Sequence, residues 1–347
     1  MTYYAVGIRR KRGDVTLDVL YPTINNDNKF SDIEPLIDAK LEANQSTTIS
    51  THDYFKLRDT LFPSLPSEHH ESSENYAQID FVLTRITDLN EPAVDTEMAY
   101  FKLQLLSQRL VQPHEQNLTG IFGLLQNIAW TNIGPILPKD LPQVQAKAVL
   151  NYQSVAVTHV DKFPYMVNYH VPSGVRIADG SRVRLGAYLG DGTTVMPAGF
   201  VNFNAGTMGN AMIEGRISAG VIVGKDSDIG GGASIMGTLS GGNDVVISIG
   251  KKCLLGANAG TGISLGDGCT IAAGVYVYAG KKVTLLNEQN EAVDINGSPV
   301  QAGQNIVKAM DLSGKDYMMF IEDSQTGELI CKPNTTVIQL NEALHKN

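Results

Sequence analysis

The chain has 347 residues, 43% of them hydrophobic and 18% charged, and its net charge at pH 7 is -9. That length gives one to three domains with a real core, and the acidic balance disfavours a nucleic-acid surface despite a basic cluster at 9–12. The sequence has no apolar run of about 18 residues and no signal-peptide pattern at its N-terminus. Its cysteines, Cys253, Cys269 and Cys331, form neither a disulfide framework nor a CxxC metal site. We expect a soluble cytoplasmic protein that does not contact membranes.

Residues 1–150 show the mixed pattern of an α/β domain. Strands are expected at 3–8 and 15–21, around a Gly13-Asp14 hairpin signal, and at 81–86. Apolar spacing predicts helices at 33–43, from an Asp95 cap to about 111, and at 121–130. The polar segment 44–70 is expected to be an irregular loop, and its histidine pair at 69–70 an exposed part of it. Three prolines between 135 and 142 mark the connection that follows.

From Val171 to Gly280 the composition changes, because this segment holds 25 of the 34 glycines. Within it aliphatic residues recur every six positions, in four runs separated by slips of phase. The positions are Ile177, Val183, Leu189, Val195, Val201, Thr207 and Ile213; Ile217, Val223, Ile229 and Ile235; Ile249 and Leu255; and Leu265, Ile271, Val277 and Val283. A period of six fits neither an α-helix nor a simple alternating strand.

The six-residue period is typical of a parallel β-helix, with one short strand and one inward aliphatic side chain on each face of a prism-shaped coil. Glycine, Asn and Asp supply the positive φ that the corners need. We predict a mainly β protein: an N-terminal α/β domain at 1–150, a left-handed parallel β-helix at 151–285 and a C-terminal αβ extension at 286–347. Residues 237–243 are expected to be a loop outside the coil, and 285–304 an excursion from it.

The residues available for chemistry within the repeats are few. No histidine lies between His170 and His345, which excludes a histidine base or a histidine-bound zinc inside the helix. His159 and His170 precede the repeats and are better explained by packing or capping. Aspartates there stand beside corner glycines, as turn residues do. Glu214 differs because it lies at a phase slip next to Arg216, where it is either part of a surface ion pair or part of a site.

Several strings in the chain resemble the longer form of the tetrahydrodipicolinate N-succinyltransferase family, within the hexapeptide-repeat acyltransferases. The resemblance covers residues 95–347 well and the first 90 loosely. The strings are DKFP at 161–164, VRIAD at 175–179, RVRLGA at 182–187, GFVNFNAGT at 199–207, MIEGR at 212–216, GGG at 230–232, MGTLSGG at 236–242, GANAG at 256–260 and LNEALH at 340–345.

The resemblance implies an enzyme of diaminopimelate and lysine biosynthesis that moves succinyl from succinyl-CoA to tetrahydrodipicolinate. Glu214 matches the family's proposed catalytic glutamate, with an anhydride or a general-base role left open. The resemblance also implies a homotrimer with active sites between subunits and small-molecule substrates. The positions matching succinyl-CoA contacts are Arg216, Gly231, Ser234, Ala257, Ala272, Ala273, Gly280, Lys308 and Ser324. Arg182 and Arg184 are weaker candidates for the substrate carboxylates, because ion pairs with turn aspartates would explain them equally well.

The chain departs from the family pattern at three places. Ser181 and Ala198 stand where some members hold a divalent cation with acidic residues, so no metal is expected. Ile321 and Glu322 replace two expected arginines, and Ala272 replaces a glutamate. Lys281, Lys282 or Lys315 would then supply the missing cations. The alternatives are an acyltransferase of this architecture with another donor or amine acceptor, and a β-helical scaffold without activity.

Overall fold

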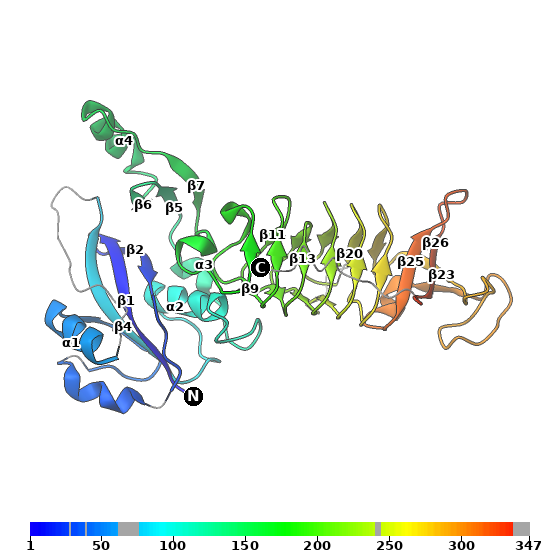
Figure 1. Cartoon of the computed structure of the whole chain (residues 1–347), viewed down its shortest axis with the longest axis horizontal. Helices are drawn as coiled ribbons and strands as arrows, with labels where there is room; N and C mark the ends of the chain where they lie inside the picture. The colour runs from blue at the N-terminus through cyan, green and yellow to red at the C-terminus, as the bar shows by residue number, and fades with distance from the viewer. Residues whose placement is uncertain (28, 39, 62–75, 240–243, 336–347) are drawn as a thin grey trace. The chain divides into compact units, whose positions relative to one another are not determined.

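The computed structural model describes residues 1–27, 29–38, 40–61, 76–239 and 244–335 (Figure 1). The chain divides into two compact units. Unit 1 comprises Met1–Pro164 and Asn168–His170, and unit 2 comprises Tyr165–Val167 and Val171–Asn347. No helix within the described ranges is both long and apolar enough to cross a membrane.

Unit 1 is built on a four-stranded antiparallel sheet in the order β2-β1-β4-β3. Its strands are β1 (Tyr3–Arg12), β2 (Val15–Leu20), β3 (Gln45–Ile49) and β4 (Gln78–Ile86). The strands predicted at 3–8, 15–21 and 81–86 are confirmed. So is the helix after Asp95, α2 (Thr96–Ser107), because the Asp95 carboxylate accepts the N–H of Met98 at 2.7 Å. This capping bond satisfies one of the helix's otherwise unpaired amides.

Other predictions for unit 1 were wrong. Instead of a helix at 33–43, the structure has two 3-10 turns, η1 (Lys29–Asp32) and η2 (Glu34–Leu36). The backbone is extended at Ile37, whose side chain packs into the core of the unit, so the helical hydrogen bonds do not continue. The expected loop at 44–70 contains β3 and α1 (Thr51–Leu61), while the histidine pair lies outside the described residues. The helix expected at 121–130 is one turn, α3 (Ile121–Leu124). It is followed by the strand β5 (Ile128–Thr131). This strand pairs with β6 (Gly134–Ile136) and with β7 (Val157–Asp161), and the helix α4 (Leu141–Leu150) lies between β6 and β7 in the chain.

Unit 2 is a parallel β-helix, as the period of six predicts, and successive coils add parallel strands to three sheets (Figure 1). The first sheet contains β8 (Arg176–Ile177), β10 (Thr194–Val195), β13 (Met212–Ile213), β16 (Asp228–Ile229), β19 (Leu254–Leu255) and β21 (Thr270–Ile271). The second sheet contains β11 (Phe200–Val201), β14 (Arg216–Ile217), β17 (Ser234–Ile235), β20 (Gly260–Gly262) and β22 (Tyr276–Tyr278). The third contains β9 (Tyr188–Leu189), β12 (Gly206–Thr207), β15 (Ile222–Val223) and β18 (Ser248–Ile249).

The predicted inward positions form the core of the β-helix. All of them are buried except Ile177, which is half-buried and packs against the same cluster. Burying each aliphatic side chain contributes about 1.5–3 kcal/mol, so stacked coils stabilise one another. The corners use left-handed backbone at non-glycine residues too, with φ of 51° at Asn204, 64° at Asp226 and 56° at Asn258. The corner prediction is therefore confirmed.

Two insertions leave the coil where the sequence predicts them. After β17 the chain turns outward, and Thr238 and Val246 pair across the base of the loop, whose residues 240–243 lie outside the described ranges. The second excursion joins β23 (Lys282–Leu285) to β24 (Ile306–Lys308). The tail then forms η5 (Ala309–Leu312) and the hairpin β25 (Met318–Glu322) and β26 (Leu329–Pro333). Because β25 pairs with β21, it covers the open edge of the last coil. Residues 336–347 of the predicted tail lie outside the described ranges.

Candidate active site

One corner of the β-helix is shorter than its neighbours. Only Glu214 and Gly215 separate β13 from β14, whereas residues 196–199 and 230–233 form the corresponding four-residue corners of the coils on either side. The N–H groups of both Glu214 and Gly215 donate to the carbonyl of Ile229, at 2.8 and 3.0 Å. A Cβ on Gly215 would lie 2.5 Å from the carbonyl oxygen of Ala233, so this tight corner requires glycine. The phase slip in the sequence therefore becomes a notch in the surface.

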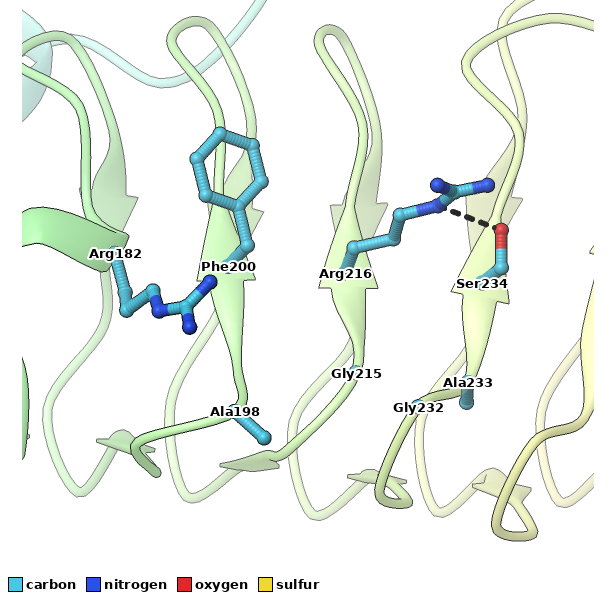
Figure 2. Close-up of a pocket in the computed structure, with 8 residues that line it drawn as sticks. All are labelled: Arg182, Ala198, Phe200, Gly215, Arg216, Gly232, Ala233 and Ser234. Carbon is cyan, nitrogen blue, oxygen red and sulfur yellow. Dashed lines mark hydrogen bonds between the residues drawn. The ribbon is translucent and has the colours of Figure 1, made fainter.

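A pocket of about 400 Å³ opens over this notch on the outer face of the second sheet (Figure 2). Figure 2 shows the Arg216 side chain directed toward Ser234, and its Nε donates to the Ser234 hydroxyl at 2.8 Å. The lining residues come from four successive coils: Arg182, Ala198, Phe200, Gly215, Arg216, Gly232, Ala233 and Ser234. The pocket thus carries two guanidinium groups above small residues that let a ligand approach the backbone.

Glu214 is half-buried at the edge of the notch. Its Oε2 lies 3.4 Å from the point that a Cβ on Gly231 would occupy, so the carboxylate sits against the corner of the next coil. Neither Glu214 nor Arg216 forms an ion pair with any residue that the structure describes. Among the described residues, the structure therefore does not contain the surface ion pair that was one interpretation of Glu214.

A row of small residues begins beside this carboxylate and follows the same corner through the next coils. Gly231, Ala257 and Ala273 form this corner row: the N–H of Asn258 donates to the Gly231 carbonyl at 2.8 Å, and that of Gly274 to the Ala257 carbonyl at 2.9 Å. Ala257 and Ala273 are exposed and Gly231 is half-buried. The corner row thus places small residues at the same corner of three successive coils, beginning beside the Glu214 carboxylate.

Comparisons with known proteins identify the family to which the chain is similar. Residues 125–165 match a family model described as the middle of tetrahydrodipicolinate N-succinyltransferase, and residues 246–279 match one described as a hexapeptide repeat of succinyl-transferase. A 2,3,4,5-tetrahydropyridine-2,6-dicarboxylate N-succinyltransferase from Pseudomonas paraeruginosa is 48% identical over 99% of this chain and 96% of its own length. The chain belongs to this family of acyltransferases.

Further relatives agree. The Vibrio cholerae enzyme of the same name is 46% identical over the full length of both chains. A solved structure from Campylobacter jejuni, described as a 2,3,4,5-tetrahydropyridine-2-carboxylate N-succinyltransferase, has a TM-score of 0.82 and 32% identity, and the match covers 97% of this chain and 93% of that one. The resemblance inferred from the sequence strings is confirmed.

The remaining donor-site positions predicted from the succinyltransferase pattern lie toward the end of the β-helix. Gly280 stands in the corner after β22, and Lys308 ends β24 directly opposite Lys282 of β23. The N–H of Ala309 donates to the carbonyl of Lys281 at 2.9 Å, which holds the Lys308 segment beside the Gly280 corner. Ala272 precedes the last residue of the corner row and donates its N–H to the Phe320 carbonyl at 2.9 Å. Ser324 is exposed in the β25–β26 turn and makes no hydrogen bond to these positions.

The structure separates the two arginines predicted for substrate carboxylates. Arg182 lines the pocket, and its Nε lies 3.7 Å from a carboxylate oxygen of Asp179 in a half-exposed ion pair. Arg184 does not line the pocket, and its Nη1 donates to the side-chain oxygen of Asn202 at 3.3 Å. Of these two, Arg182 is the one that lines the pocket.

The positions at which some succinyltransferases hold a cation carry other groups here. The Ser181 hydroxyl donates to Asp179 at 2.6 Å, and Ala198 contributes only a methyl group to the pocket lining. Within the described ranges, no three His, Cys, Asp or Glu side chains come together as a metal site would require. His159 stacks on Trp130 in unit 1, and burial followed by the charge of Arg109 lowers the pKa of His170.

Sequence reasoning missed Phe200 and Gly215 as parts of the pocket. A signal was present: Phe200, Arg216 and Ser234 each come directly before an inward aliphatic residue and therefore face outward, and the strand register aligns them. Gly215 is the second residue of the phase slip itself. Both follow from the same repeat that predicts the core.

Proposed function

We propose that the chain transfers the succinyl group of succinyl-CoA to tetrahydrodipicolinate, giving N-succinyl-2-amino-6-oxopimelate and CoA. The observation that carries the proposal is the two-residue corner, which sets the Glu214 carboxylate against Gly231 at the head of the corner row. A pantetheine arm along Gly231, Ala257 and Ala273 would deliver its thioester to this carboxylate, and the acyl group would enter the pocket beside Arg216 and Ser234.

The reaction needs one proton to be moved at the nitrogen of the acceptor. Water adds across the C=N bond of the ring, and the resulting amine nitrogen attacks the thioester carbon. A C–N bond forms, the C–S bond breaks, the nitrogen loses a proton and the CoA thiolate gains one; the ring then opens to the ketone. Glu214 serves either as the base that accepts this proton or as a nucleophile that first carries succinyl as an anhydride.

The two roles of Glu214 and the overall reaction are tested together. Mixing the protein with both substrates should release CoA thiol, and no release above background would contradict the proposal. Succinyl-CoA alone in a single turnover separates the roles: the anhydride route releases one CoA per site before the acceptor is added, and the general-base route releases none.

A second candidate is an acyltransferase with a different donor or amine acceptor. Ile321 favours it, because this residue pairs across the terminal strands with Ile330 and places two isoleucines side by side where the family pattern has a cation. A panel of acetyl-, succinyl- and longer acyl-CoA donors distinguishes the two functions by the donor with the highest kcat/KM.

We further propose a homotrimer of left-handed β-helices with the active sites between subunits. The pocket supports this because it lies on the outer face of a sheet, where a neighbouring subunit would complete it. Sedimentation should give about three times the 37.4 kDa mass of one chain, and a monomer at micromolar concentration would refute shared sites.

The buried free thiols of Cys253, Cys269 and Cys331 support a reducing, cytoplasmic compartment. The three-part division at 150 and 285 stays a prediction.

A further inference from the structure

One row of residues crosses the outer face of the second sheet. Phe200 pairs with Arg216, Arg216 with Ser234, Ser234 with Gly260 and Gly260 with Tyr276, each in direct register between neighbouring strands. Because the next residue of each strand is buried in the core, these five side-chain positions all face outward. We call them the outer row. Its first three members line the pocket, and the last two continue it toward the end of the β-helix.

The Tyr276 ring lies along the surface of the sheet and does not project away from it. A Cβ on Gly260 would lie 2.1, 2.4 and 2.5 Å from three carbons of the Tyr276 ring, so the ring lies flat over Gly260. Any side chain at position 260 would displace it. Neighbouring strands are about 4.8 Å apart, and the ring therefore reaches across one strand and ends short of Ser234.

Ser234 is approached from both sides. The Arg216 guanidinium reaches it from the preceding coil and donates to its hydroxyl oxygen at 2.8 Å, while the Tyr276 ring covers the following strand. Ser234 is accordingly only 9% exposed. The Tyr276 hydroxyl has no hydrogen-bond partner among the residues that the structure describes, although its ring is half-buried.

Two donors line one end of the pocket, the Arg216 guanidinium and the O–H of Ser234, and the Tyr276 ring lies over the next strand beyond Ser234. A guanidinium with hydroxyl groups beside it suits a carboxylate, because charge-assisted hydrogen bonds are stronger than neutral ones. The acyl group expected in the pocket carries such a carboxylate at its free end. Because the Tyr276 ring extends from its own strand across Gly260, its hydroxyl lies at the end of the ring nearer to Ser234.

We propose that Tyr276, held flat by Gly260, is a specificity-determining residue that binds the free carboxylate of the donor's acyl group together with Arg216 and Ser234. The inference rests on the proposed function, since it takes succinyl-CoA as the donor. It adds a residue that selects a dicarboxylic acyl group over a monocarboxylic one of the same length.

Equilibrium binding of succinyl-CoA and butyryl-CoA, measured by calorimetry without acceptor, tests the proposal. The two donors have the same chain length, and butyryl-CoA lacks the carboxylate. Tyr276→Phe should weaken succinyl-CoA binding about tenfold or more and change butyryl-CoA binding less than twofold, because a hydrogen bond to a charged group is lost and the ring is kept. Tyr278→Phe is the matched control, since this tyrosine is exposed outside the outer row, and should leave both affinities unchanged.

The outcomes separate the inference from the proposed function. Equal binding of both donors by the wild-type chain would refute the choice of succinyl-CoA and the inference with it. A wild-type preference for succinyl-CoA that persists in Tyr276→Phe would overturn the inference alone. Gly260→Ala should reproduce the loss of preference by displacing the ring, and if that variant does not fold, the Tyr276→Phe result decides.

Discussion

Replacing Gly215 with alanine isolates the contribution of the shortened corner. The added methyl carbon would lie 2.5 Å from the Ala233 carbonyl oxygen and 2.8 Å from a methyl group of Ile229, both closer than contact distance. The corner must move away from the next coil, which also disturbs the two hydrogen bonds to the Ile229 carbonyl. Overpacking of this kind costs about 1–3 kcal/mol of unfolding free energy. A displacement of about 1 Å at Glu214 is expected to lower kcat roughly 100-fold.

The control for Gly215→Ala is Gly224→Ala, which lies at a different corner of the β-helix, between β15 of the third sheet and β16 of the first. A Cβ there would lie 2.5 Å from the carbonyl carbon of Gly250, so the clash is similar and Glu214 is untouched. Urea unfolding and CoA-thiol release should show comparable losses of stability in both variants, and a loss of activity only in Gly215→Ala. Activity within twofold of wild type in Gly215→Ala, at the same stability loss, would refute the reasoning that the corner positions the carboxylate.

Three further predictions concern stability. Burial raises the pKa of Asp80, but hydrogen bonds and charge from Arg9 and Lys11 outweigh it and lower the pKa overall. This stabilisation is complete above about pH 5 and is lost progressively as the pH falls through the unfolded-state and then the folded-state pKa. In acid titrations of unfolding, Asp80→Asn should lose about 1–2 kcal/mol at pH 7 and show a shallower acid limb. Lys102 is buried, and its ammonium donates to three backbone carbonyls; Lys102→Met should lower the unfolding free energy by about 2–4 kcal/mol, and a change below 0.5 would contradict this assignment. Ile229→Ala, at a fully buried core position, should cost about 2–4 kcal/mol by the same measurement, unless the coil collapses around the cavity.

The β-helix is predictable from sequence because each coil repeats the same physical requirement. An inward aliphatic residue every six positions and small or left-handed residues at corners leave one consistent arrangement, and Val195, Ile213 and Ile229 are buried as that arrangement demands. Glu214 is accessible to the same reasoning, since a slip of phase is a local departure from a strict repeat. The family strings then supplied the chemistry that spacing alone left open.

Unit 1 was predicted less well because its elements depend on distant partners. Residues 128–130 fall in the helix predicted at 121–130, yet pairing with β6 and β7 makes them part of a strand. The apolar spacing at 33–43 favours a helix, yet the backbone is extended at Ile37, whose side chain packs into the core of the unit. The position of Tyr276 was missed for another reason: the period of six places it on the outer face, but only the absence of a side chain at Gly260 lays its ring toward Ser234.

The most direct test of the central claim is the turnover of Glu214→Gln with both substrates present. The substitution keeps the size of the side chain and removes its charge and basicity. CoA release should be slowed about 100-fold or more, with circular dichroism and sedimentation matching the wild-type chain. A folded Glu214→Gln variant with near-normal turnover would contradict the role assigned to this carboxylate.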